Sequence, residues 1–306
     1  MAILNGIVSK MKGSAGNLTF KQVNGVTIVS EKMTSQTNPR TEGQMKTRTK
    51  FTNIIQMYRG IRPLINYGFE SKPQGINDYN MFVRVNMQQT PVYLTKQMVA
   101  GGACIAAPYQ ITQGSLPAIV ISGSGNSSAT DIFLGSQSLS ASTTVADFAK
   151  AVVENNPDYK YGDQISYFII RQRINEATGT PYCNFDAYAV VLDAADTSKL
   201  WDVVPKNGFY VQDGCIGKYG NDGDCVFAWV HSRKTNGKTL VSSQQLIDAN
   251  SKLSEYQGDV AYTIAAGSYG ETGSAFLTPN GKGDVNGNVN NGNINGNGNA
   301  GGGDSL

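Results

Sequence analysis

The chain contains one histidine, His231, so any catalytic dyad or triad built on imidazole has to use this side chain. His231 directly follows residues 225–230, an apolar run that is typical of a strand in a protein core. No Gly-x-Ser-x-Gly sequence, the strained turn that presents a nucleophilic serine, occurs in the chain. We therefore expect His231 to be structural and the protein not to be an enzyme.

Metal and nucleotide motifs are incomplete. No pair of cysteines has the short spacing of zinc ligands, and a chain of this length folds without disulfides, so we expect four reduced, mostly buried thiols: Cys104, Cys183, Cys215 and Cys225. Gly237-Lys238-Thr239 matches the end of a P-loop, but the first glycine of that motif would fall at Ser232. We predict a turn there and no cofactor.

Two acidic segments resemble calcium loops only in part. Residues 284–288 begin like an EF-hand, yet Val289 stands where that loop needs glycine and Asn295 stands where it needs a bidentate glutamate. A second set lies in a glycine-rich loop: Asp213, Asp222 and Asp224. Solvated turns explain both segments better, so we predict no metal site.

Lys46, Arg48 and Lys50 have the clearest potential to bind a charged partner. On the polar face of one helix they would be placed to contact phosphates. Few aromatic residues accompany them, and nothing resembles a DNA-recognition helix. The alternatives are a solvated face or pairing with an acidic surface of a neighbouring protein, and both stay open.

The helix that carries these residues is predicted over residues 41–58. Asn38-Pro39 keeps the preceding chain extended, and Thr41 with Gln44 forms a capping box. Helical spacing places four apolar residues in one stripe, which we interpret as a protein-docking surface: Phe51, Ile54, Ile55 and Tyr58.

Further elements flank this helix. Residues 18–23 and 26–30 form a predicted hairpin around Asn24-Gly25. A second helix is predicted over residues 77–87, with Asn77 as its cap and with Met81, Phe82 and Val85 on one face. Later helices are predicted over residues 144–154, with a Thr144/Asp147 capping box, and over residues 253–266.

From residue 91 onward the sequence is rich in strands separated by Gly, Asn, Asp and Ser turns. The predicted strands are residues 116–122, 164–173, 184–193, 208–212, 225–232 and 239–243. This pattern predicts an α+β protein, mainly β, with an antiparallel sandwich or barrel-like body. We divide the chain into a docking arm at residues 1–90, a body at 91–278 and a flexible Asn/Gly-rich tail at 279–306.

Composition limits the function classes. The 306 residues carry a net charge of +2, which argues against a protein that coats nucleic acid by bulk charge. No signal peptide or membrane-spanning apolar run is visible, so we expect synthesis in a cytoplasm and no membrane partner. No small-molecule substrate is evident.

Several stretches resemble an uncharacterised domain family that is common in Bacteroidetes and in the tailed phages that infect them. The stretches are residues 1–6, 38–51, 62–65, 68–69, 109–117, 222–230 and 240–243. Residues 144–158, 162–165 and 268–270 are closest to the versions carried by crAss-like phages of Bacteroidales. The resemblance implies a structural protein of the virion and supplies no catalytic residues.

The leading hypothesis is therefore a non-enzymatic structural protein of a tailed phage, located in the capsid, a head-to-tail ring or the tail. Its expected partners are copies of itself and other virion proteins. One alternative is a nucleic-acid-associated protein that uses the basic helix. Another is a host-surface binding module with a calcium-responsive tail.

Overall fold

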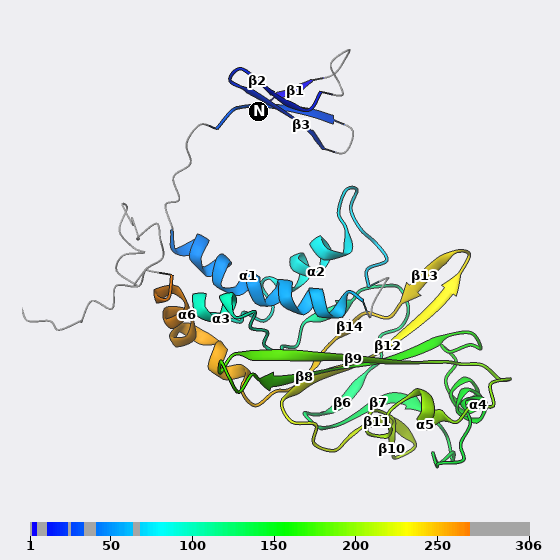
Figure 1. The fold of residues 1–306 in the computed structure, drawn as a ribbon. Coiled ribbons are helices and arrows are strands. Elements are labelled where there is room, and N and C mark those ends of the chain that lie inside the picture. Colours follow the sequence, from blue (N-terminus) through cyan, green and yellow to red (C-terminus); the bar gives the residue numbers. More distant parts are fainter. Residues whose placement is uncertain (1, 5–10, 24–25, 34–40, 64–67, 270–306) are drawn as a thin grey trace, which may run out of the picture.

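The computed structural model describes residues 2–4, 11–23, 26–33, 41–63 and 68–269 (Figure 1). Strands account for 35% of the described residues and helices for 27%, so the protein is α+β and mainly β, as predicted. The predicted tail, including residues 284–295, lies outside the described residues. The division at residue 90 stays a prediction.

The N-terminal strands form an antiparallel sheet of their own, which lies apart from the rest of the described chain (Figure 1). Its order is β1-β4-β3-β2, with bounds Ala2–Leu4, Val26–Glu31, Leu18–Val23 and Gly13–Ala15. Val23 pairs with Val26, so two residues connect β3 to β4, as the Asn24-Gly25 pair predicts.

Three helices follow: α1 (Glu42–Ile61), α2 (Asp78–Asn86) and α3 (Lys96–Ala100). The Thr41 hydroxyl accepts a hydrogen bond from the Gln44 amide at 3.4 Å, and the Asn77 side chain accepts one from the Asn80 amide at 2.9 Å. Both predicted N-caps are confirmed, because each side chain satisfies an amide that the first helical turn leaves without a partner.

A long antiparallel sheet crosses the body in the order β13-β12-β8-β9, and β15 also pairs with β12. The bounds are Lys238–Val241, Cys225–Thr235, Gln164–Ile174, Pro181–Val191 and Ile247–Ala249. Along β12, Val226, Ala228 and Val230 join the core cluster that contains α1 and α2 residues. Their neighbours Cys225, Phe227 and Trp229 join a separate cluster on the other face. Burial on both faces explains the uninterrupted apolar run in the sequence.

A second sheet, ordered β10-β11-β7-β6, packs against that other face and gives the sandwich-like body. Its bounds are Tyr210–Gln212, Cys215–Tyr219, Ser127–Phe133 and Ile121–Ser124. Helices α4 (Val145–Asn155) and α5 (Leu200–Val203) complete this side, and the predicted Thr144/Asp147 capping box is present. The remaining elements are β5 (Gln110–Thr112), which pairs with β14 (Gln244–Gln245), two 3-10 turns (Lys206–Gly208 and Leu253–Tyr256) and α6 (Gly258–Gly267), which contacts α1.

The strand predicted at residues 116–122 is wrong for most of its length, because β6 begins only at Ile121. Pro117 has no amide to donate, and Leu116 forms only an isolated bridge with Ser242. Strand β7 was not predicted. Two of its buried positions are the polar residues Ser128 and Thr130, so the sequence lacks the alternation of apolar and polar residues that marks a half-buried strand.

Residues 103–109 cross the core outside any strand, and almost all of them are buried. Amide side chains satisfy their backbone. Asn53 of α1 donates to the Ile105 carbonyl at 3.0 Å and accepts from the Ile105 amide at 2.8 Å. Asn86 of α2 makes the same pair of bonds to Gln110, at 2.9 and 2.7 Å. Gln172 accepts from the Ala106 amide, and Asn250 donates to the Ala106 carbonyl.

We expect Asn53→Ala to lower the free energy of unfolding by about 3 kcal/mol, because it leaves the buried amide and carbonyl of Ile105 without partners. Urea denaturation measures the loss. Thr47→Ala, at an exposed position of the same helix, is the control and should change stability by less than about 0.5 kcal/mol. Equal losses in the two variants would contradict the role given to Asn53.

Candidate docking surface

The buried face of α1 differs from the predicted apolar stripe. The helix turns mainly Met45, Thr49, Asn53, Met57 and Ile61 inward, together with Ile54. The other three residues of the stripe, Phe51, Ile55 and Tyr58, are only half-buried. The stripe is thus divided, since Ile54 belongs to the core of this chain and its neighbours border the outer face of α1. The sequence pattern missed this because Thr49 and Asn53 are polar residues on a buried face.

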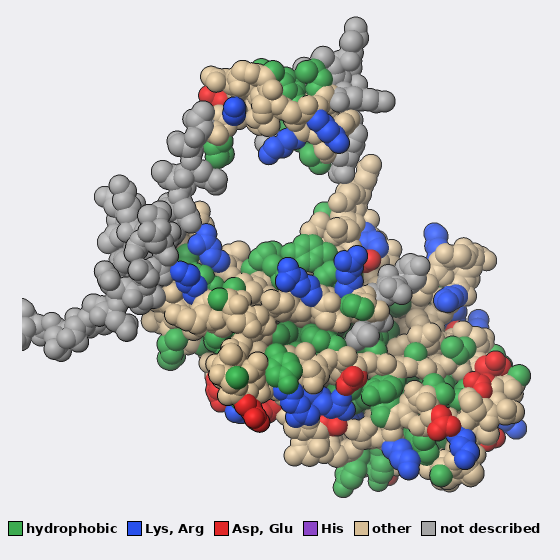
Figure 2. All heavy atoms as spheres, viewed as in Figure 1, with side chains coloured by type: hydrophobic (Ala, Val, Ile, Leu, Met, Phe, Trp, Pro, Cys, Tyr) green, Lys and Arg blue, Asp and Glu red, His purple; other side chains and the backbone are tan. Residues whose placement is uncertain are grey.

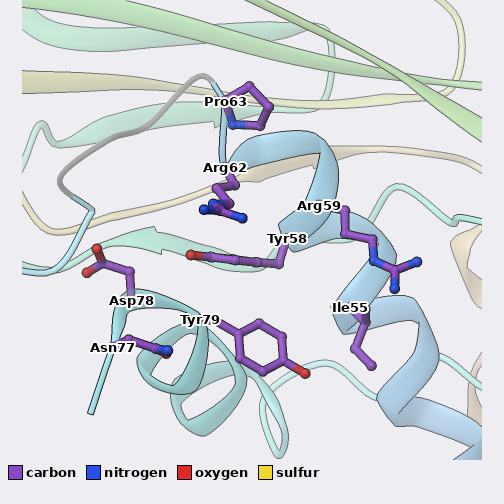
Figure 3. Close-up of a pocket in the computed structure, with 8 residues that line it drawn as sticks. All are labelled: Ile55, Tyr58, Arg59, Arg62, Pro63, Asn77, Asp78 and Tyr79. Carbon is purple, nitrogen blue, oxygen red and sulfur yellow. The ribbon is translucent and has the colours of Figure 1, made fainter. Parts of the chain in front are cut away.

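A groove of about 920 Å³ lies between the C-terminal half of α1 and the start of α2 (Figure 3). Its lining combines aromatic, basic and amide side chains: Ile55, Tyr58, Arg59, Arg62, Pro63, Asn77, Asp78 and Tyr79. The Tyr58 ring meets the Tyr79 ring edge to face, with centroids 5.3 Å apart, and also contacts Phe82 of the core at 5.4 Å. These contacts fix the aromatic wall of the groove.

The arginines of the groove have no carboxylate partner among the described residues. Asp78, the acidic residue of the lining, pairs instead with Lys72 at 2.8 Å. Burial raises the pKa of Tyr58, Asp78 raises it further and Arg62 opposes the shift, so the phenol stays protonated at neutral pH. The groove therefore presents two exposed guanidinium groups beside aromatic rings.

The predicted basic residues Lys46, Arg48 and Lys50 lie on the N-terminal half of α1. The Lys46 ammonium lies 5.6 Å from the Tyr262 ring centroid, and Arg48 Nη1 lies 3.8 Å from Met45 Sδ. Burial, and then the neighbouring charge of Lys46, lower the pKa of Lys50. No ion pair to any of the three is found in the described part of the chain. Figure 2 shows blue side chains along the surface formed by α1.

Charge divides unevenly along the chain. Residues 1–100 contain thirteen Lys and Arg against four Asp and Glu, whereas residues 101–306 contain twelve against nineteen. The net charge of the whole chain is thus near zero, although its N-terminal third is basic. Such a surface attracts acidic partners, either proteins or phosphates.

The N-terminal sheet exposes apolar side chains on a small, separate element. Leu18 is 46% exposed, Val23 48% and Val26 37%, and Thr27 is the one residue of β2, β3 and β4 that is buried. The described strands of this sheet therefore have almost no buried core of their own.

His231 is buried and bonded to an acidic side chain. Its Nε2 lies 2.8 Å from the Asp163 carboxylate, which also accepts two hydrogen bonds from Arg233 at 2.7 Å each. Its ring stacks on Tyr159 and is 1% exposed, and the Ser242 hydroxyl bonds the backbone amide of His231 rather than its ring. Burial lowers the pKa of His231 more than Asp163 raises it, which favours the neutral ring. The prediction of a structural histidine agrees with this geometry.

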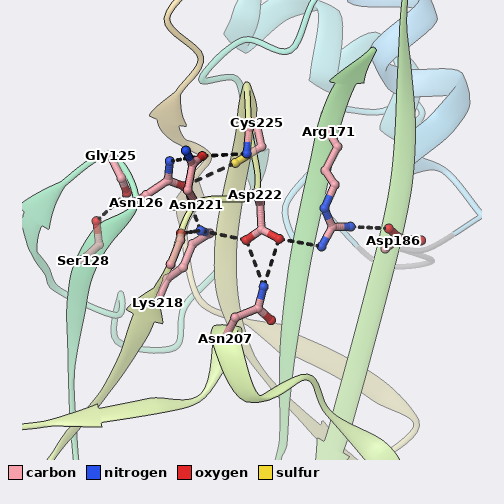
Figure 4. A network of polar contacts seen from close by, with 12 residues as sticks. Gly125, Asn126, Ser128, Arg171, Asp186, Asn207, Lys218, Asn221, Asp222 and Cys225 are labelled. Atoms are coloured by element: carbon pink, nitrogen blue, oxygen red, sulfur yellow. Dashed lines mark hydrogen bonds and ion pairs between the residues drawn. The ribbon is translucent and has the colours of Figure 1, made fainter.

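In the glycine-rich acidic loop, Asp222 is bonded to other side chains of the protein (Figure 4). The fully buried Lys218 ammonium donates to Asn126, to the Gly220 carbonyl and to Asp222, each at 2.8 Å, which uses all three of its protons. Asp222 further pairs with Arg171 at 3.1 Å. Burial alone would raise the pKa of Asp222, but these cations lower it. Asp222 therefore lies in a buried ion-pair network rather than in the solvated turn we expected.

Asp224 accepts hydrogen bonds from the amide and hydroxyl of Ser251, and Asp213 occupies a turn with φ of 52°. Within the described ranges, no group of three His, Cys, Asp or Glu side chains is arranged to hold a metal ion. All four thiols are free, with Cys104 and Cys225 buried. None of the described helices is both long enough and apolar enough to cross a membrane.

Comparison with known proteins relates about half of the chain to a family model. Residues 10–158 match the model of a family of unknown function, DUF6266. The matched region spans β2 to β4, the helices α1 to α4 and the strands β5 to β7, so it includes the groove and most of the N-terminal sheet. No curated protein and no solved structure matches the chain. The resemblance to an uncharacterised family is supported over this region, and the phage setting stays a prediction.

We expect Asp163→Asn to destabilise the fold by about 3 kcal/mol at pH 7, because it leaves the Arg233 charge without its buried partner. The control is Glu154→Gln, which removes an exposed ion pair to Lys150 and should cost less than about 1 kcal/mol. Chemical denaturation at pH 7 measures both. Equal losses would show that the Asp163 network contributes no more than a surface pair.

The wild-type protein should also lose stability as the pH falls below about 6.5, the pKa of an unperturbed histidine. The folded pKa of His231 is depressed, so the unfolded chain takes up the proton first and unfolding is favoured by acid. Below about pH 4 the depressed pKa of Asp163 adds to the loss, although burial by itself would raise that pKa. Denaturation from pH 7 to pH 5 tests the first step, and a flat profile would contradict it.

Proposed function

We propose that this protein is a non-enzymatic structural component of a tailed bacteriophage particle and that it joins its neighbours through the N-terminal sheet and the outer face of α1. The observation that carries the proposal is the separate N-terminal sheet, whose exposed apolar side chains have no surface of the described body to cover them. An element of this kind gains stability by packing against another chain.

Two further observations support an assembly role over catalysis. The single histidine is buried with its Nε2 bonded to Asp163, and Asp222 pairs with both the buried Lys218 and the half-buried Arg171. The groove beside α1 offers arginines and tyrosines, which are the residue types enriched at the centres of protein interfaces. The virion setting in this proposal is what the resemblance of the sequence to a domain family of Bacteroidetes and their phages implies.

Incorporation into particles tests this proposal. Particles purified from an infected host should contain the protein when analysed by mass spectrometry, and Val23→Glu should reduce its copy number at least tenfold by placing a charge on the docking sheet. Val191→Glu is the matched control, because Val191 is 47% exposed and Val23 is 48% exposed. Absence of the wild-type protein from intact particles, or equal incorporation of the two variants, would refute the proposal.

A second candidate is supported by one observation, namely the lack of ion pairs to Lys46, Arg48 and Lys50 in the described structure. In this case α1 would bind nucleic acid through its phosphates. Filter binding over a salt series separates the two functions, since each phosphate contact adds about −0.9 to the slope of log K against log salt. Charge reversal at the three residues should then abolish nucleic-acid binding. An affinity for nucleic acid that does not change with salt concentration would exclude this second function.

A further inference from the structure

A pocket of about 520 Å³ opens on the second sheet, on the opposite side of the long sheet from α1. The loop at residues 135–141 forms one wall, and residues of α5 and β10 form the other. The volume lies within the range of small-molecule sites. Nothing in the docking surface described above accounts for this pocket.

The lining of the pocket mixes polar and apolar side chains and is nearly uncharged. Ser136 and Ser138 are exposed, and no hydrogen bond to either hydroxyl is found within the described structure. Gln137 donates from Nε2 to the Ser138 carbonyl at 3.1 Å, which leaves its amide oxygen free to accept. Lys206 is the only charged residue of the lining, and no carboxylate contributes to it. The pocket therefore offers hydroxyl and amide groups that suit a neutral, hydroxyl-rich ligand.

Aromatic rings complete the lining. Trp201 is half-buried in α5, and Tyr210 is 43% exposed in β10. Tyr210 stacks on Tyr219, with ring centroids 4.8 Å apart and planes 26° apart, which holds its ring in a defined orientation. The electron-rich face of such a ring attracts the weakly positive C–H groups on the apolar face of a sugar.

The pocket is formed before any ligand arrives. The Leu134 amide donates to the Gly214 carbonyl at 2.7 Å, and the buried Thr143 hydroxyl accepts from the Ser140 amide at 2.8 Å. Gly214 has φ of 74°, a backbone conformation that favours glycine, and a Cβ there would lie 2.4 Å from the Phe133 ring and 3.1 Å from the Gly135 carbonyl oxygen. A pre-formed site loses little conformational entropy on binding.

We propose that this pocket binds a neutral glycan, with Trp201 and Tyr210 against the sugar rings and with Ser136, Gln137 and Ser138 bonded to sugar hydroxyls. A single lysine is too little charge for a nucleic acid, which needs several phosphate contacts. The inference does not depend on the proposed function, because it concerns a different face of the molecule.

Tryptophan fluorescence tests the proposal on the full chain. The protein has two tryptophans, and Trp229 is fully buried with its Nε1 bonded to the Gly208 carbonyl at 2.8 Å, so a bound sugar should change mainly the emission of Trp201. A glycan array first identifies bound neutral glycans. Titration with the strongest of them should give a saturable change in emission that is lost in Trp201→Phe.

Tyr210→Ala should weaken glycan binding about tenfold, as expected for the loss of one aromatic contact. Tyr182→Ala is the matched control, since Tyr182 is 41% exposed but lies on β9, outside the pocket, and its affinity should equal that of the wild type. Ser138→Ala provides a second, milder variant, and thermal melting confirms that each variant folds. The proposal is overturned if no glycan on the array binds, or if Tyr182→Ala and Tyr210→Ala weaken binding equally.

Discussion

Four amide side chains hold the buried segment that passes between the helices and the long sheet. Residues 103–109 lie outside every described strand, so their backbone groups would be costly to bury without other partners. Asn53, Gln172 and Asn250 supply partners to Ile105 and Ala106 from α1, β8 and the chain that follows β15. Asn86 of α2 holds the end of the segment by bonding Gln110, the first residue of β5. Each amide both donates and accepts, so it can satisfy a carbonyl and an amide of the backbone. This arrangement fixes α1 and α2 relative to the sheet, and it aligns α1 so that Arg59, Arg62 and the half-buried Tyr58 line the groove between the helices.

Buried charged side chains, like the buried backbone groups, have hydrogen-bond partners within the protein. Lys218 and Asp163 are almost fully buried, and each is surrounded by partners that use its hydrogen-bonding capacity. Buried charges with complete partners tie distant segments together, since breaking one pair leaves the other charge unsolvated. The apolar core of the body therefore also holds a few buried charges, and these are paired within the fold. The features left open are on the surface, namely the N-terminal sheet, the outer face of α1 and the glycan pocket.

The sequence was most informative where local rules dominate. The caps at Thr41, Asn77 and Thr144 and the turn at Asn24-Gly25 were all predicted, because each depends on residues three or fewer positions apart. The buried face of α1 was not, because it includes the polar residues Thr49 and Asn53, and the Asn53 amide bonds groups up to 56 residues away. Strand β11 was missed for a related reason, since Lys218 occupies a buried position that normally takes an apolar residue. The glycan pocket combines a loop and a strand more than sixty residues apart, and no spacing in the sequence brings them together.

The central claim is that the closed body carries two open docking elements, the N-terminal sheet and the outer face of α1. Hydrogen–deuterium exchange, compared between the free protein and the protein in purified particles, tests this claim most directly. Peptides from β2, β3, β4 and α1 should gain protection on assembly, whereas those from β8 and β12 should be strongly protected in both states because their ladders are buried. Unchanged exchange in the N-terminal sheet and in α1, with new protection elsewhere, would contradict the account.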